Sequence, residues 1–172
     1  MGTILILANS SGGLFDFRNE LVLELLKQNK VVISVPDAVK TNELEEEGCD
    51  IIHTPINRRG MNPKEDLKLF FAYRKLLKRI RPDLVLTYTI KPNIYGGLAC
   101  RIKKVPYMVT VTGLGSTFQK EGILKKLIVL MYRVGLKKAE CVFFQNQQNK
   151  RIFEEYAIVG KKSSLVSGSG VN

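Results

Sequence analysis

The segment 109–118 carries the residues best suited to chemistry in this chain. It reads Val-Thr-Val-Thr-Gly-Leu-Gly-Ser-Thr-Phe. The β-branched run up to Val111 predicts a strand, and Gly113 and Gly115 end it at once. Backbone N–H groups exposed between a strand and a helix N-terminus can receive an anion. The pattern therefore predicts a ligand-binding loop.

A basic, apolar helix is predicted directly after this loop, over residues 122–138. Residues 120–138 contain a single acid, Glu121, and six basic residues: Lys120, Lys125, Lys126, Arg133, Lys137 and Lys138. A ligand loop beside such a helix suggests a substrate that is partly anionic and partly apolar.

Two further loops follow predicted strands and could bind a ligand. Residues 9–14 include Gly12 and Gly13, which would let a phosphate or a sugar approach the next helix N-terminus. After the fourth predicted strand, Lys91 and Asn93 flank a proline at a helix start, where they could bind an oxygen-rich ligand. The alternatives are a tight capped turn at the first loop and a solvated lysine at the second.

A fourth loop begins at Gln145 and Asn146, two polar residues that close an apolar strand. A ligand contact and a plain helix cap explain this pair about equally well.

Several kinds of site are excluded by the sequence. The loop at residues 9–14 is not Gly-x-Gly-x-x-Gly, and the chain has no Walker phosphate loop, so no dinucleotide or other cofactor is expected. His53 is the only histidine and the three cysteines are widely separated, which disfavours a metal site and indicates reduced thiols. There is also no Asp-x-Asp of a metal-dependent transferase.

The order of predicted elements indicates an α/β fold. Apolar runs predict seven strands, at 3–8, 30–35, 50–53, 83–87, 107–111, 141–144 and 163–166. Helices are predicted at 13–28, 39–47, 63–80, 92–102, 122–138 and 147–156. Strands that are apolar throughout favour a parallel sheet covered on both faces. We expect a Rossmann-like, doubly wound, mostly parallel sheet, with ligands at the carboxyl ends of its strands.

The positive charge lies in the middle of the chain. Residues 68–138 hold 16 Lys and Arg against two acids, whereas residues 1–67 hold 7 basic and 11 acidic residues, and the whole chain carries +11. Such a field attracts nucleic acid, anionic lipid or phosphorylated ligands without choosing among them. The longest apolar run, 127–132, is far too short to span a bilayer, and no signal peptide is expected at the N-terminus.

Four motifs together resemble the N-terminal half of bacterial family 4 glycosyltransferases, in the branch that builds capsule, O-antigen or lipid-linked oligosaccharides. In chain order they are Lys91–Asn93, Thr112–Gly115, Val142–Asn146 and Ser167–Val171. The resemblance implies a two-domain GT-B enzyme whose first domain holds the acceptor and whose second binds a nucleotide sugar. We therefore expect a Rossmann-like domain over residues 1–166, with residues 167–172 starting the linker to a donor-binding domain absent from this chain.

Departures from the family pattern limit what can be assigned. Many relatives carry a histidine after the fifth strand, where this chain has Thr112 and Gly113, and His53 lies in a different loop. The paired glutamates of the family belong to the second domain. Catalytic residues are thus unknown, and the resemblance implies transfer with retention by a full-length enzyme, the fragment alone being inactive.

The resemblance implies roles for residues in each loop. Gly12, Gly13, Asn146 and Ser169 would lie near the donor cleft. The acceptor would be held by Lys91, Asn93, Thr112, Gly113, Ser116 and Phe118, core packing being the alternative for Phe118.

The implied partners are a nucleotide sugar, expected to be a UDP-sugar, and a saccharide on polyprenyl diphosphate. Lys120, Lys125, Lys126, Arg133, Lys137 and Lys138 would face an anionic membrane, with Leu124, Leu127, Ile128 and Met131 reaching the interface. This implies a cytoplasmic protein, peripheral on the inner face of the plasma membrane. The alternative to membrane contact is that this helix packs its apolar face on the sheet and exposes its lysines to solvent.

Two other functions fit the sequence less well. Half of a sugar-nucleotide epimerase is disfavoured because the chain shows no cofactor fingerprint and no acid/base pair. A basic nucleic-acid-binding Rossmann module is disfavoured because no zinc finger, ribonucleoprotein motif or helix-turn-helix is present. We expect no nucleic-acid partner.

Overall fold

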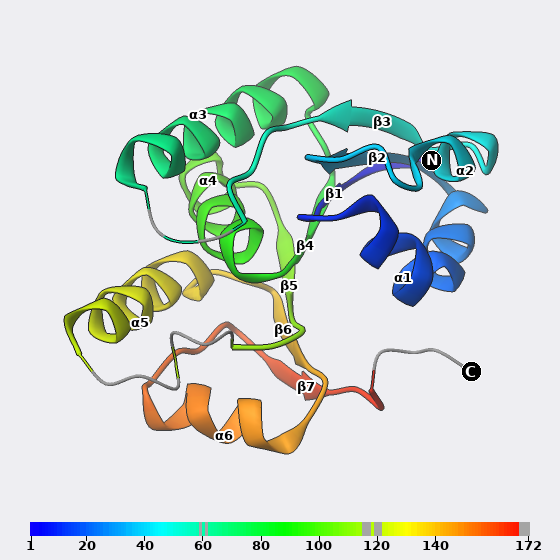
Figure 1. Cartoon of the computed structure of the whole chain (residues 1–172). Helices are drawn as coiled ribbons and strands as arrows, with labels where there is room; N and C mark the ends of the chain where they lie inside the picture. The colour runs from blue at the N-terminus through cyan, green and yellow to red at the C-terminus, as the bar shows by residue number, and fades with distance from the viewer. Residues whose placement is uncertain (59, 61, 115–117, 119–121, 169–172) are drawn as a thin grey trace.

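A seven-stranded sheet, parallel at every strand pair, forms the centre of the molecule (Figure 1). The computed structural model describes residues 1–58, 60, 62–114, 118 and 122–168. The strands are β1 (Gly2–Leu7), β2 (Asn29–Val35), β3 (Asp50–His53), β4 (Leu84–Tyr88), β5 (Tyr107–Val111), β6 (Cys141–Phe144) and β7 (Ser163–Leu165). Their order in the sheet is β3-β2-β1-β4-β5-β6-β7. The predicted α/β class and Rossmann-like sheet are confirmed.

Helices connect the strands on both faces of the sheet. They are α1 (Ser11–Leu26), α2 (Thr41–Glu46), α3 (Pro63–Ile80), η1 (Pro92–Gly96), α4 (Gly97–Lys103), α5 (Ile123–Leu136) and α6 (Gln147–Glu155). Figure 1 shows α1 and α2 beside β1–β3 on one face, and α3, α4 and α5 together on the other. The strand order reverses between β1 and β4, so the loops after these strands diverge and open a crevice at their carboxyl ends.

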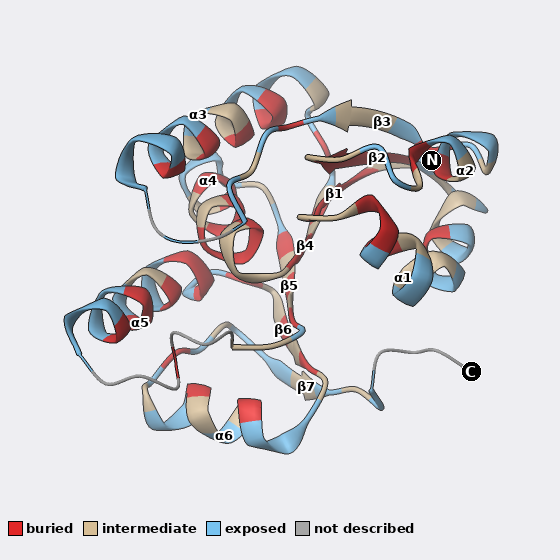
Figure 2. Ribbon diagram, in the orientation of Figure 1, coloured by how far each residue is buried: buried red, intermediate tan, exposed pale blue. Residues whose placement is uncertain are grey.

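Two apolar clusters hold these layers together. On the face of α3–α6, strand residues such as Val85 and Val109 pack with helix residues such as Tyr73 and Tyr132. On the other face, Ile6, Val31 and Ile33 pack beneath α1 and α2. Strands buried on both faces explain the continuous apolar runs of the sequence, and each buried aliphatic side chain contributes roughly 1.5–3 kcal/mol. Figure 2 shows the resulting pattern, with buried central strands, more exposed edge strands β3 and β7, and exposed outer helix surfaces.

A π-helical turn, η1, precedes α4 and was not predicted. Close packing against α5 accompanies it: a Cβ added to Gly97 would lie 2.6 Å from the carbonyl oxygen of Gly135. A Cβ on Gly135 would in turn lie 2.8 Å from the carbonyl oxygen of Ile94. Glycine on both sides lets the two helices approach backbone to backbone, and π turns of this kind often occur at functional sites.

One stretch of sheet has no helix over it in the described part of the chain. An apolar groove of about 680 Å³ runs over β4, β5 and β6 on the α1 side. Its walls include Phe17 and Leu21 from α1, together with Leu86, Met108 and Phe143 from the strands. Phe17 and Leu21 border this groove and are exposed, although both are apolar.

Candidate functional site

The four predicted ligand loops meet at one pocket of about 350 Å³, at the carboxyl ends of β1, β4, β5 and β6. We call it the crevice pocket. It is lined by Ala8, Asn9, Ser10, Gly13, Leu14, Phe17, Arg18, Tyr88, Thr89, Thr112 and Gln145. The volume lies within the range of small-ligand sites. The sequence-based expectation that these loops lie together agrees with this geometry.

The first helical turn of α1 forms one wall. The Ser10 side chain caps the helix by accepting a hydrogen bond from Gly13 N at 3.2 Å. Gly13 borders the pocket, whereas Gly12 is buried, and a Cβ added there would contact Val39 at 3.5 Å. Both glycines therefore lie in the first turn of α1, and Gly13 is the one next to ligand space.

Asp37, which the sequence analysis did not single out, binds the N-terminus of α1. Its Oδ1 accepts hydrogen bonds from Ser11 N at 2.9 Å and from the Ser11 hydroxyl, and its Oδ2 pairs with Arg58. Ser11 Oγ also accepts from Lys40 N at 3.0 Å. A carboxylate already satisfies this helix terminus, so the wall is better suited to neutral hydroxyls than to a second anion. The signal in the sequence that could have identified Asp37 is its position, two residues after the last residue of β2.

Arg18 and Gln145 connect α1 to β6 across the pocket. In the amide orientation that satisfies both of its groups, Gln145 donates to the Thr112 carbonyl oxygen at 3.2 Å and accepts from the Arg18 guanidinium. The Arg18 guanidinium carbon also lies 5.7 Å from the centre of the Tyr88 ring. Burial raises the pKa of the Tyr88 hydroxyl, which keeps it protonated. Arg18 and Tyr88 were missed because nothing local marks a helix arginine or a strand tyrosine as part of a site.

Thr89, the first residue after β4, has an unusual backbone. Its φ is 72°, in the left-handed region that β-branched residues rarely adopt. The other described non-glycine residues with positive φ are Arg81, Lys104 and Ala157, each close behind the end of a helix. Thr89 Oγ1 is buried and has no hydrogen-bond partner within the described protein. A strained residue with an unsatisfied hydroxyl thus borders the pocket.

Asn93 and Lys91, predicted to bind the acceptor, are engaged within the fold. Asn93 is buried; its Oδ1 accepts from Thr87 Oγ1 at 2.8 Å and its Nδ2 donates to the Thr110 carbonyl at 2.9 Å. Lys91 Nζ lies 2.7 Å from Asp66 Oδ1, and both side chains are nearly buried. Neither residue borders the crevice pocket. Lys91 is therefore neither a solvated lysine nor a group free for a ligand.

Asp66 also faces Tyr95, on η1. Burial raises the pKa of the Tyr95 hydroxyl, and the nearby Asp66 carboxylate raises it further. The Asp66–Lys91–Tyr95 cluster ties α3 to the start of the π turn, so it acts on the position of the loop after β4.

Of the other residues predicted to bind the acceptor, two lie at or next to the crevice pocket and one lies in the core. Thr112 borders the crevice pocket, and a Cβ added to the next residue, Gly113, would meet no described atom within 4 Å. Phe118 is buried in the core against Phe153 and Tyr132, at ring-centre distances of 6.2 and 6.1 Å, which corresponds to the core-packing alternative.

Asn146 acts as a helix cap: its Oδ1 accepts from Asn149 N at 2.8 Å at the start of α6. Ser116, Ser169 and Lys120 lie outside the described residues.

The basic residues of α5 do not all face outward. Lys126, Arg133, Lys137 and Lys138 are exposed, whereas Lys125 is only 9% exposed, with its ammonium nitrogen 5.2 Å from the centre of the Tyr156 ring. Lys125 is thus corrected from a membrane-facing residue to one whose charge is held against an aromatic ring. Arg133 Nε also donates to the Tyr156 carbonyl at 2.6 Å.

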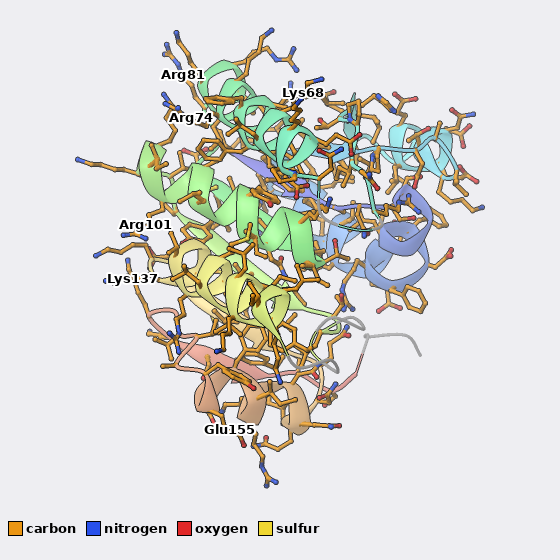
Figure 3. All side chains as sticks on the ribbon, turned by 60° about the vertical axis from the view of Figure 1, so that its left-hand side comes forward. Lys68, Arg74, Arg81, Arg101, Lys137 and Glu155 are labelled. Carbon is orange, nitrogen blue, oxygen red and sulfur yellow. The ribbon has the colours of Figure 1, made fainter. Side chains whose placement is uncertain are left out.

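The outer surfaces of α3, α4 and α5 together form one basic and apolar face, here called the α3–α5 surface. Figure 3 shows Lys68, Arg74, Arg81, Arg101 and Lys137 projecting from this side. Its exposed apolar side chains are Leu67, Phe71, Ile102, Ile123, Leu124, Leu127, Leu130 and Val134. Ile123, Leu127, Leu130 and Val134 have the spacing of one helical stripe. Of the other residues predicted at an interface, Ile128 is buried and Met131 is half-buried.

Two remaining expectations concern metals and membrane spans. Within the described residues, no group of three or more His, Cys, Asp or Glu side chains is arranged to hold a metal ion. His53 Nε2 lies 2.7 Å from the Pro36 carbonyl, which connects β3 to the loop after β2. No described helix combines the length and hydropathy that crossing a bilayer requires.

Comparison with known proteins identifies the family of this chain. The family model described as "Glycosyl transferase 4-like" matches residues 3–146. A curated relative from Campylobacter jejuni, N,N'-diacetylbacillosaminyl-diphospho-undecaprenol alpha-1,3-N-acetylgalactosaminyltransferase, is 27% identical over 96% of this chain and 46% of its own length. The chain therefore spans less than half of this relative.

Solved structures of low sequence identity share the fold. HepE of Anabaena, crystallised with UDP and glucose, aligns with a TM-score of 0.68 at 15% identity, over 98% of this chain and 45% of HepE. A putative UDP-N-acetylglucosamine 2-epimerase from Listeria monocytogenes aligns with a TM-score of 0.64 at 16% identity, over 95% of this chain and 44% of that one. A protein crystallised with UDP and glucose and an epimerase thus share this architecture.

Proposed function

Because this chain belongs to the glycosyl transferase 4-like family, we propose that it is the acceptor-binding half of a glycosyltransferase of surface polysaccharide biosynthesis. The enzyme would move a hexosyl or N-acetylhexosaminyl group from a nucleotide sugar to a saccharide on polyprenyl diphosphate. The Campylobacter relative, named for a diphospho-undecaprenol-linked substrate, supports this choice of acceptor.

The observation that carries the proposal is the crevice pocket at the switch point of the sheet. Its polar lining consists of hydroxyl, amide and guanidinium groups, and no carboxylate of the described residues borders it. Hydroxyls and amides both donate and accept hydrogen bonds, as recognition of a neutral sugar requires. The Asp37 carboxylate at the α1 terminus adds support, because it disfavours a second anion there and leaves the hydroxyl-rich walls for the saccharide.

Donor binding belongs, in this proposal, to a further domain reached through residues 167–172. A UDP-sugar is the proposed donor, and the UDP-bound HepE structure supports this by fold analogy. Gly13 and Asn146 would lie on the side of the cleft that faces this domain. Transfer with retention at the anomeric carbon is part of the proposal, and so is the absence of turnover by residues 1–172 alone.

The α3–α5 surface supports a position on the membrane that carries the acceptor. Each Lys or Arg close to an anionic leaflet contributes roughly 1 kcal/mol of attraction, and an apolar stripe can enter the headgroup boundary. We place the protein on the cytoplasmic face of the plasma membrane, held by Lys126, Arg133, Lys137 and Lys138 of α5 with neighbouring cations of α3 and α4.

A binding measurement tests the function. The chain is titrated with nanodiscs that hold a short-chain polyprenyl diphosphate bearing one N-acetylhexosamine, and with nanodiscs that hold the same lipid diphosphate without a sugar. Tighter binding of the sugar-bearing lipid is expected. Equal binding of both lipids, or epimerisation of a UDP-N-acetylhexosamine by the chain, would contradict the proposal.

A further inference from the structure

We propose that Arg18 binds the diphosphate of the lipid-linked acceptor at the crevice pocket, so that the pocket recognises an anionic group as well as a saccharide. The inference rests on the proposed function, which supplies the chemistry of the acceptor, and it assigns one side chain to the charged part of that acceptor. It depends on the charge of the pocket, the accessibility of the guanidinium and the way in which its neighbours hold it.

Arg18 is the charged residue of the crevice pocket. The other described residues that line the pocket are neutral. No carboxylate of the described chain forms an ion pair with Arg18. By contrast, Arg58 pairs with Asp37 beside the start of α1. Lys91 pairs with Asp66 before η1. A cation without a counterion at a pocket wall favours an anionic ligand there.

The guanidinium of Arg18 has N–H groups available to a ligand. One nitrogen, Nη1, donates to the Phe17 carbonyl oxygen at 2.9 Å, and Nη2 donates to the Gln145 side chain. Nε donates to no described residue, and it is not one of the buried side-chain atoms that lack a partner. Arg18 as a whole is half-buried. Its unpaired N–H groups are therefore accessible, and each can donate to a phosphate oxygen.

Three neighbours hold the guanidinium at the pocket. Its N–H groups are accepted by Phe17 and Gln145, and its carbon lies 5.7 Å from the centre of the Tyr88 ring. All three residues border the crevice pocket, so the guanidinium lies at this pocket. A side chain that is already fixed loses little conformational freedom on binding. A planar guanidinium can also donate two parallel hydrogen bonds to one phosphate.

The diphosphate of the acceptor is the anion that suits this position. The Asp37 carboxylate already accepts the Ser11 N–H at the start of α1, so that helix terminus is not available to a phosphate. The diphosphate of the donor belongs to a further domain in the proposed function. Because the first sugar of the acceptor is joined directly to its diphosphate, a saccharide in this pocket of about 350 Å³ keeps the diphosphate within reach of the wall.

Substitution of Arg18 tests this role with the bare lipid, because the diphosphate is common to the bare and the sugar-bearing lipid. In phosphatidylcholine nanodiscs that hold a short-chain polyprenyl diphosphate, we expect Arg18→Gln to raise Kd by about tenfold or more. Arg18→Lys keeps the charge and loses the planar fork, so its Kd should lie between those of the parent and Arg18→Gln. The matched control is Arg151→Gln, which removes the same charge from an exposed position on α6 and should stay within about twofold of the parent.

Two further measurements separate a bound diphosphate from other roles of Arg18. The Kd of the parent should rise more steeply with salt concentration than that of Arg18→Gln, because the variant lacks one contact between opposite charges. A structural role would lower affinity and leave the salt dependence unchanged. UDP in solution is titrated with the same variants, and its binding should not depend on Arg18.

Each outcome has a distinct meaning. Equal Kd values for Arg18→Gln and Arg151→Gln, or a weaker Arg18→Gln with the salt dependence of the parent, would overturn the inference and leave the proposed function standing. Binding of UDP that depends on Arg18, without such dependence for the lipid, would assign the anion to the donor and also overturn it. The proposed function has its own readout, the preference of the parent for the sugar-bearing lipid, which Arg18→Gln should retain.

Discussion

Lys91 Nζ lies 2.7 Å from Asp66 Oδ1, and this nearly buried ion pair joins the turn before η1 to the first turn of α3. It connects two segments that flank the crevice, and it explains why a lysine at a predicted ligand position is not available to a ligand. Removal of one partner should leave an uncompensated buried charge.

Breaking this pair should destabilise the fold. Lys91→Met is expected to lower the free energy of unfolding by about 3 kcal/mol, because Asp66 is then charged and nearly buried. The double variant Lys91→Met with Asp66→Asn should recover part of the loss, and the two single variants complete a double-mutant cycle. Urea unfolding provides the measurement, and strict additivity of the two substitutions would argue against a coupled pair.

The contact between Gly135 and the π turn should tolerate no side chain. Gly135→Ala would place a Cβ 2.8 Å from the Ile94 carbonyl oxygen, and it is expected to cost about 1–3 kcal/mol through a forced separation of α5 from η1. The matched control is Gly113→Ala, whose Cβ would meet no described atom within 4 Å. Thermal unfolding of both variants checks the prediction, which fails if the two thermal midpoints agree.

Membrane attachment should depend on the exposed cations of α5. Charge reversal of Lys126, Arg133 and Lys137 should weaken binding to anionic vesicles by about 100-fold or more, since each cation contributes roughly 1 kcal/mol. A control variant reverses Lys27, Arg151 and Lys162, which are exposed and lie outside the α3–α5 surface. Vesicle flotation measures both variants, and equal losses would indicate a general effect of net charge.

The apolar part of the same surface has a separate test. Ile123→Ser with Leu127→Ser and Leu130→Ser removes exposed side chains of one helical stripe. Binding in high salt should fall most in this variant, because salt screens the cations and leaves the apolar contact. A salt-resistant fraction that equals that of the parent would show that the stripe does not enter the interface.

Alkaline pH should destabilise the protein through a buried thiol. Burial raises the pKa of Cys49 from 9.0 to about 11, so the folded state keeps the proton after the unfolded state has lost it. The stability from this group is fully present below pH 9 and is lost as the pH rises to about 11. Urea unfolding across this interval should show a shallower decline for Cys49→Ala than for the parent. Identical declines would exclude a contribution from Cys49.

The fold followed closely from local sequence patterns. Apolar runs located all seven strands, for example 107–111 as predicted and as observed. The helix predicted over 63–80 begins at Pro63 as expected, and Asn146 caps α6, which is one of the two explanations that the sequence left open. The π turn at residues 92–96 was missed because it accompanies a backbone contact between Gly97 and Gly135, which no local pattern reports.

The location of the candidate site could be predicted from the sequence, whereas the side chains available at that site mostly could not. A parallel sheet brings the loops after β1, β4, β5 and β6 to one edge, so the sequence alone determined where a ligand could bind. It also determined that the middle of the chain is basic. Which side chains remain free was decided only by the tertiary structure, because partners come from distant segments. Lys91 is bound to Asp66, 25 residues away, and Asn93 to Thr110, 17 residues away.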